Sequence, residues 1–198
     1  MTTTYKTILL ILLTVILASC NAGYKKVNNK WAYVTYDEGS GKRTNFLDID
    51  ERTFEILKDN EFAKDKSTVF FQGNQIYHAD SRTFIVIGNG YSKDDFNVFL
   101  DCETVVEANP KTFRQFAFPY SRDNNHIYCG TIPLAVNDIE NFKVTKGSEM
   151  QTSELTTNFI KDNPEYSFLD TLKYKGVIYG EGQAKTSTEI FEGYKKKK

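Results

Sequence analysis

Apolar residues along most of the chain come in short runs that are separated by polar or glycine-rich breaks. Residues 83–87 form a β-branched and aromatic run, Gly88-Asn89-Gly90 interrupts it, and a second run follows at 97–100. Such runs are typical of β-strands, and Gly and Asn tolerate the positive φ angles of tight turns. The pattern predicts a strand, a glycine turn, a turn containing Asp94 and a second strand.

The same pattern recurs along the chain at a nearly constant interval. Three basic-Asp pairs are spaced 29 residues apart, and they are Lys64-Asp65, Lys93-Asp94 and Arg122-Asp123. Three aromatic residues precede them at the same spacing, namely Phe62, Tyr91 and Tyr120. Thr-Phe pairs at 53–54, 83–84 and 112–113 are 30 and 29 residues apart. A fixed period of this length indicates a tandem repeat protein.

Each repeat predicts three short strands, and a single repeat is too small to bury its aromatic face alone. Neighbouring repeats must therefore stack or pair. We predict a mainly all-β fold, in which tandem repeats of about 29 residues form a meander or solenoid-like array of short antiparallel strands. One short inserted helix is expected at 152–162, because Leu155, Phe159 and Ile160 share a helical face.

The ends of the array are less regular than its middle. Trp31 to Tyr36 is interpreted as the start of a leading copy, and Lys161-Asp162-Asn163 as the turn of a degraded last copy. That last interpretation requires an insertion at 146–157. The repeat domain is expected to cover residues 30–194, followed by a basic tail at 195–198.

The amino terminus has the pattern of an export signal. Lys6 precedes an apolar run from Ile8 to Leu17, which is shorter than the ~20 residues of a membrane-spanning helix. Leu17-Ala18-Ser19-Cys20 resembles the lipobox of bacterial lipoproteins, which implies cleavage after residue 19 and lipidation of Cys20. Residues 20–29 are then expected to be a lipidated tether. An ordinary secretory leader or an uncleaved anchor helix are the alternatives.

The resemblance to a lipobox implies the cellular localisation of the protein. We expect it in a bacterial cell envelope, attached to a membrane through the acyl chains on Cys20. In a Gram-negative cell this would be the outer membrane or the cell surface. Two or more acyl chains give stable attachment, because each buried methylene contributes ~0.8 kcal/mol.

The repeats resemble those of the DKNYY family of bacterial envelope proteins. That family combines a basic-Asp turn, an aromatic strand pair and a following "TF" element. Its namesake motif survives approximately here, as Asp65-Lys66-Ser67, Asp94-Asp95-Phe96 and Asp123-Asn124-Asn125. The resemblance is clearest over residues 49–145, and it implies an architecture without implying an activity.

Charge argues against one class of partner, and the cysteine content bears on a possible disulfide. Lys and Arg total 25 and Asp and Glu total 26, so no net basic field favours nucleic acid. Cys102 and Cys129 remain after lipidation of Cys20. An even number of cysteines in an exported protein permits a disulfide, and two unbridged thiols are the alternative.

Few residues or motifs indicate a catalytic, metal or cofactor site. His78 and His126 occupy different phases of the repeat, and we find no nucleophile, zinc or phosphate-loop motif and no motif for a cofactor. Two repeated rows are each open to two interpretations. Asp65, Asp94 and Asp123 could bind calcium or stabilise Asx-turns, and Phe62, Tyr91 and Tyr120 could form an aromatic binding row or core.

These observations favour a non-catalytic binding or scaffolding protein, anchored to a membrane through its amino-terminal lipid. The expected partner is an unknown envelope protein or glycan. The alternative is an envelope enzyme or carbohydrate-processing accessory with a cleft near the insertion at 146–157. An enzyme of this kind would need convergent carboxylates with perturbed pKa values, whereas a scaffold needs only an accessible surface.

Overall fold

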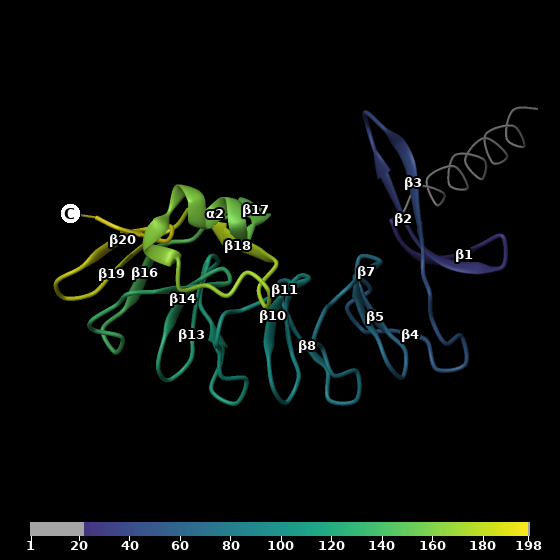
Figure 1. Ribbon diagram of the computed structural model, residues 1–198, viewed down its shortest axis with the longest axis horizontal. Helices are drawn as coiled ribbons and strands as arrows, with labels where there is room; N and C mark the ends of the chain where they lie inside the picture. Colours follow the sequence, from purple (N-terminus) through teal and green to yellow (C-terminus); the bar gives the residue numbers. More distant parts are fainter. Residues whose placement is uncertain (1–21, 198) are drawn as a thin grey trace, which may run out of the picture. The chain divides into compact units, whose positions relative to one another are not determined.

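The computed structural model describes residues 22–197, which contain mostly short antiparallel strands (Figure 1). Contacts divide the chain into two units. The first holds the residues up to 65 together with 70–74, and the second holds 66–69 together with the residues from 75 onward. The predicted all-β repeat array is confirmed.

The first unit contains a three-stranded sheet in the order β1-β2-β3 and most of a four-stranded sheet in the order β4-β5-β6-β7. Its strands are β1 (Gly23–Val27), β2 (Lys30–Asp37), β3 (Gly41–Phe46), β4 (Glu55–Ile56), β5 (Phe62–Lys64), β6 (Val69–Phe71) and β7 (Asn74–Gln75). Tyr24, Tyr33, Ala63 and Phe70 form its hydrophobic core.

The second unit contains three four-stranded sheets and one two-stranded sheet. Their orders are β11-β10-β9-β8, β12-β13-β14-β15, β16-β19-β20-β21 and β17-β18. The first two sheets use β8 (Ile85–Gly88), β9 (Tyr91–Lys93), β10 (Val98–Leu100), β11 (Glu103–Thr104), β12 (Arg114–Gln115), β13 (Tyr120–Arg122), β14 (Ile127–Cys129) and β15 (Ile132–Leu134). The others use β16 (Lys143–Lys146), β17 (Gln151–Leu155), β18 (Gly176–Gly180), β19 (Gln183–Lys185), β20 (Ile190–Glu192) and β21 (Lys195–Lys196).

Strand register shows which segments are equivalent repeats. Lys93 pairs with Val98 across β9 and β10, and Arg122 pairs with Ile127 across β13 and β14. Lys185 pairs with Ile190 across β19 and β20 in the same way. β16 pairs with β19 in the same way as β12 pairs with β13. The sheet β16-β19-β20-β21 therefore corresponds to the sheet β12-β13-β14-β15 and is a further copy of the repeat.

This copy corrects our interpretation of the carboxyl-terminal repeats. The turn at Lys161-Asp162-Asn163 is instead the end of a helix, and the true copy has Thr186 where the earlier ones have Asp94 and Asp123. Thr186 keeps part of the turn chemistry, because its Oγ1 accepts the backbone N–H groups of Thr188 and Glu189. The insertion is longer than expected, since it separates the first two strands of the copy and runs over residues 147–182.

The insertion contains the helix that the sequence predicts, in a shorter form. α2 covers Thr156–Asp162 and is followed by a 3₁₀ turn, η1 (Pro164–Tyr166). Residues 152–155, expected in the helix, belong to β17, which pairs with β18 beside the helix (Figure 1). Phe159 is fully buried and packs with Tyr166 and Val177, which docks the helix onto the repeat array of this unit.

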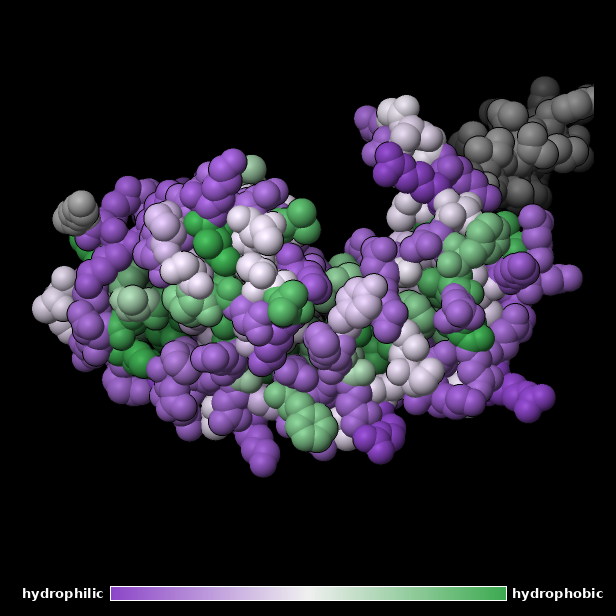
Figure 2. All heavy atoms as spheres, viewed as in Figure 1, coloured by the Kyte–Doolittle hydropathy of each residue, from purple (hydrophilic) through white to green (hydrophobic). Residues whose placement is uncertain are grey.

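Two terminal segments are more regular than expected. Residues 23–27, expected in the tether, form β1, because Tyr24 is buried against Tyr33 and the strand pairs along its length with β2. Lys195 and Lys196, expected in a tail, form β21 and pair with β20. Hydrophilic residues cover most of the face that Figure 2 shows, with hydrophobic residues in small patches. Within residues 22–197, no helix combines the length and the apolar character that crossing a membrane requires.

Candidate functional site

The basic-Asp pairs form the most regular polar structure of the molecule. Asp94 Oδ1 accepts the backbone N–H groups of Phe96 at 2.7 Å and Asn97 at 2.6 Å, which closes the turn after β9. Its Oδ2 accepts the N–H of Asp80 at 2.8 Å. One carboxylate therefore fixes two turns, the one that follows it and the one at the start of the same repeat.

Asp123 repeats this arrangement one copy later. Oδ1 accepts the N–H groups of Asn125 and His126, both at 2.7 Å, and Oδ2 accepts the N–H of Asn109 at 2.9 Å. The Tyr128 hydroxyl donates to the same Oδ2 at 2.9 Å. Burial raises the pKa of Asp123, but these donors outweigh it, so the pKa lies below its usual value.

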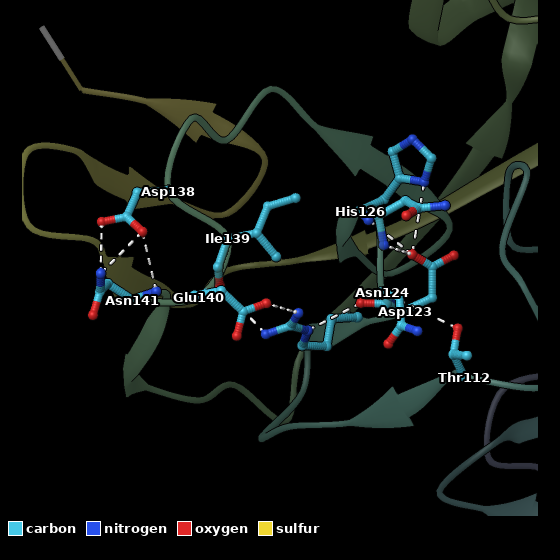
Figure 3. Close-up of polar contacts among 10 residues, drawn as sticks. Thr112, Asp123, Asn124, His126, Asp138, Ile139, Glu140 and Asn141 are labelled. Atoms are coloured by element: carbon cyan, nitrogen blue, oxygen red, sulfur yellow. Dashed lines mark hydrogen bonds and ion pairs between the residues drawn. The ribbon is translucent and has the colours of Figure 1, made fainter.

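In two of the three pairs, the basic residue contacts the next repeat. Lys93 Nζ donates to the carbonyl of Pro110 at 2.7 Å, and Arg122 Nη1 donates to the carbonyl of Ile139 at 3.4 Å. Arg122 also pairs with Glu140 at 2.7 Å, and Figure 3 shows Glu140 on the same turn as Asp138 and Asn141. The basic-Asp pair thus joins the turn before it to the turn after it.

This geometry argues against calcium binding by the Asp row. Asp65, Asp94 and Asp123 are all buried, and each uses carboxylate oxygens to accept backbone N–H groups, such as that of Asp50 for Asp65. Within residues 22–197, no cluster of three or more His, Cys, Asp or Glu side chains is arranged to hold a metal ion. The oxygens that calcium would need are occupied by the turns, which favours the Asx-turn interpretation of these residues.

The aromatic row is also a structural feature. Phe62, Tyr91 and Tyr120 are 0%, 2% and 0% exposed, so they cannot form a surface for a ligand to stack on. Tyr91 and Tyr120 belong to the cores of successive sheets. The binding interpretation of this row is wrong, because the side of each strand on which these residues lie faces the interior.

The two described cysteines are both thiols. Cys129 is fully buried in the core around Tyr120, where its Sγ contacts the carbonyl of Gly180, and Cys102 lies half-buried in the turn between β10 and β11. Burial raises the pKa of each thiol to about 12. The proposed bridge is not formed, and Cys20 lies outside the described residues.

A groove opens where the insertion meets the last repeat. Three segments line it, namely residues 146–150, 179–183 and 192–195, and its volume is about 730 Å³. We call it the insertion groove. The segment after β16 is held in place because Ser148 N–H donates to the carbonyl of Phe118 at 2.7 Å. Gly182 allows the close packing, since a Cβ there would lie 2.5 Å from Pro119 Cδ.

The insertion groove carries charges of both signs beside two tyrosines. Glu149, Glu181 and Glu192 are exposed, as is Lys195, and Lys197 lowers the pKa of Glu192 through an ion pair. Tyr179 and Tyr194 pack edge to face with ring centroids 4.9 Å apart. The Tyr179 hydroxyl donates to Glu154 at 2.7 Å. Burial, together with this hydrogen bond, raises the pKa of Tyr179.

The sequence predicts this groove only in part. It predicts a cleft near 146–157, and residues 146–150 line the groove, but no motif indicates residues 179–183 and 192–195. The available signal was the cluster of glycines at 176, 180, 182 and 193. Their concentration around the last repeat indicates close approach of backbone segments.

Comparison with known proteins adds a family assignment. No curated protein and no solved structure matches the chain. The model of the DKNYY family matches residues 4–103 and 91–198. These two segments overlap and together span the repeats that the basic-Asp turns define. The chain therefore belongs to the DKNYY family.

Proposed function

We propose that this protein is a membrane-anchored bacterial lipoprotein whose repeat array presents a non-catalytic binding site in the insertion groove. The single observation that supports this site is its position. The groove lies where the repeats stop agreeing with one another, and its lining comes from the insertion and from the copy that the insertion splits. Elsewhere the repeated polar residues are engaged in turns.

The electrostatics of the groove favour binding over acid-base catalysis. Its three carboxylates are exposed, and the pKa of Glu192 is lowered, so this group is anionic at neutral pH. A general acid needs a pKa near the working pH. Glu103 is a carboxylate whose pKa is raised, through burial, but it accepts a hydrogen bond from Gly176 N–H and does not line the groove.

Site-specific photocrosslinking in intact cells tests the binding site. A benzophenone amino acid replaces Met150, which lines the groove and is 73% exposed. The matched control carries it at Leu172, which is 79% exposed and lies outside the groove. We expect a discrete adduct at Met150 alone. Equal adducts at both positions, or none at either, would contradict the proposal.

The anchor rests on the lipobox at residues 17–20. Metabolic labelling with a fatty acid probe should label the parent protein and leave Cys20→Ala unlabelled. Cys102→Ala is the matched control, and it should be labelled as strongly as the parent. Equal labelling of the parent and Cys20→Ala would refute lipid attachment at this residue.

A further inference from the structure

A second, more polar pocket lies beside the insertion groove and shares Ser148 and Glu149 with it. Its volume is about 370 Å³, within the range of about 300–1,000 Å³ that small-molecule sites occupy. Its side-chain amides come from Asn89, Gln115 and Gln151. We call it the amide pocket.

The amides of this pocket are held in fixed orientations. Asn89 Nδ2 donates to Gln115 Oε1 at 3.1 Å, and Gln115 Nε2 donates to the carbonyl of Gly88 at 2.9 Å. Gln151 Nε2 donates to Asp101 Oδ2 at 2.6 Å. Each amide has two donor hydrogens and an oxygen with two lone pairs. These bonds therefore orient the amides and leave part of their hydrogen-bonding capacity unused.

Aromatic side chains complete the lining. Phe116 and Phe118 are half-buried, so each presents part of its ring to the pocket. Tyr91 also lines the pocket but is 2% exposed, so the two phenylalanines provide most of its aromatic surface.

Charge indicates which ligands suit this lining. Glu149 is the one charged side chain among the described residues that line the pocket, and it is exposed. No Lys or Arg of the described chain lines it, so phosphate and carboxylate groups would find no counter-ion. Oriented amides can donate to and accept from hydroxyl groups at the same time, and aromatic faces suit the apolar faces of a pyranose ring.

We propose that the amide pocket binds a neutral saccharide unit. This inference rests on the proposed binding function and names the class of ligand beside the insertion groove. Gln115 and Gln151 are the residues that bind its hydroxyl groups, and Phe118 provides an aromatic surface for the ring.

Ligand-observed saturation-transfer NMR on the full chain, kept in a detergent without a sugar headgroup, tests the inference. The probes are cellotriose, maltotriose and chitotriose, with inorganic phosphate as a competitor. We expect transfer to at least one trisaccharide and no displacement by phosphate. Gln115→Met and Gln151→Met keep the side-chain length but remove the amide, and each should weaken binding about tenfold.

Gln75→Met is the matched control, because Gln75 is exposed on β7 and lines neither cavity. It should bind like the parent. Gln151 is exposed, so its replacement leaves folding intact and decides the test if the Gln115 variant is unstable. Absence of transfer to all three sugars, binding that survives in Gln151→Met, or displacement by phosphate would overturn the inference. Crosslinking at Met150 would still report on the insertion groove, so the two proposals can fail separately.

Discussion

At the scale of single residues, the buried Asp of each repeat is the group on which the turns depend. Asp123 accepts four hydrogen bonds with its two carboxylate oxygens and is 1% exposed. The exposed Asp95 has no comparable set of donors to its side chain among the described contacts. Two residues of the same type therefore have different roles, and burial distinguishes them.

Replacing Asp123 should destabilise the repeat array. Asp123→Ala leaves backbone N–H groups of two turns without their acceptor, and each unpaired buried group costs about 1–3 kcal/mol. We expect a loss of about 2–4 kcal/mol in the free energy of unfolding, measured by urea denaturation. Asp95→Ala is the control and should change stability by less than about 0.5 kcal/mol. Similar effects of the two substitutions would contradict the assigned role.

The lowered pKa of Asp123 predicts how stability depends on pH. In the unfolded chain an Asp has a pKa of about 3.9, and the folded value is lower. The ionised form therefore stabilises the fold fully above about pH 5, and this contribution is lost as the pH falls through the folded pKa.

Asp123→Asn removes this titration. The variant should be less stable than the parent at pH 7, and the difference should shrink between about pH 5 and pH 2. Urea denaturation across that range, with Asp95→Asn as control, measures the effect. A stability difference between parent and Asp123→Asn that is constant with pH would show that the charge of Asp123 has no part in it.

At the scale of elements, the sequence predicts the regular copies well and the split copy poorly. The spacing of Asp65, Asp94 and Asp123 identifies three hairpins, because each local motif makes its own turn. The last copy lacks this motif, since Thr186 replaces the Asp and the insertion separates β16 from β19. Lys161-Asp162 has the sequence of a basic-Asp pair, but these residues end α2, whose Phe159 packs into the core.

The candidate site was less predictable than the repeats. Residues 146–150, 179–183 and 192–195 are separated in sequence, and only strand pairing and packing bring them together. The aromatic row at Phe62, Tyr91 and Tyr120 has the correct spacing for a surface ladder, but spacing does not report which face of a strand is buried.

Phe159 is the residue that fixes the insertion to the repeats. It is fully buried and its ring lies 5.2 Å from that of Tyr166 and 5.1 Å from that of Tyr194. Phe159→Ala should cost about 3–5 kcal/mol, measured by denaturation. Phe168→Ala makes the same change at a site that is 63% exposed, and it should cost much less. Equal losses would mean that α2 does not depend on this contact.

At the scale of the whole molecule, we assign different roles to the repeats and the insertion. The basic-Asp pairs connect successive turns, as Lys93 does through Pro110 and Asp94 does through Asp80. The insertion interrupts this regularity and lines a groove with exposed charges. We therefore expect substitutions in the repeat turns to change stability, and substitutions in the groove to change binding.

Crosslinking combined with thermal unfolding tests whether the repeats serve stability and the insertion groove serves binding. The crosslinker at Met150 is placed in a chain that also carries Glu181→Lys and Glu192→Lys, two exposed positions in the insertion groove. The control chain has the same crosslinker at Met150 and carries Glu38→Lys and Asp95→Lys. These substitutions make the same change in charge at exposed positions outside the insertion groove. We predict that the groove variant loses the adduct while its Tm stays within about 3 °C of the parent, and that the control keeps the adduct. An adduct that persists in the groove variant, or is lost equally in the control, would contradict binding in the insertion groove.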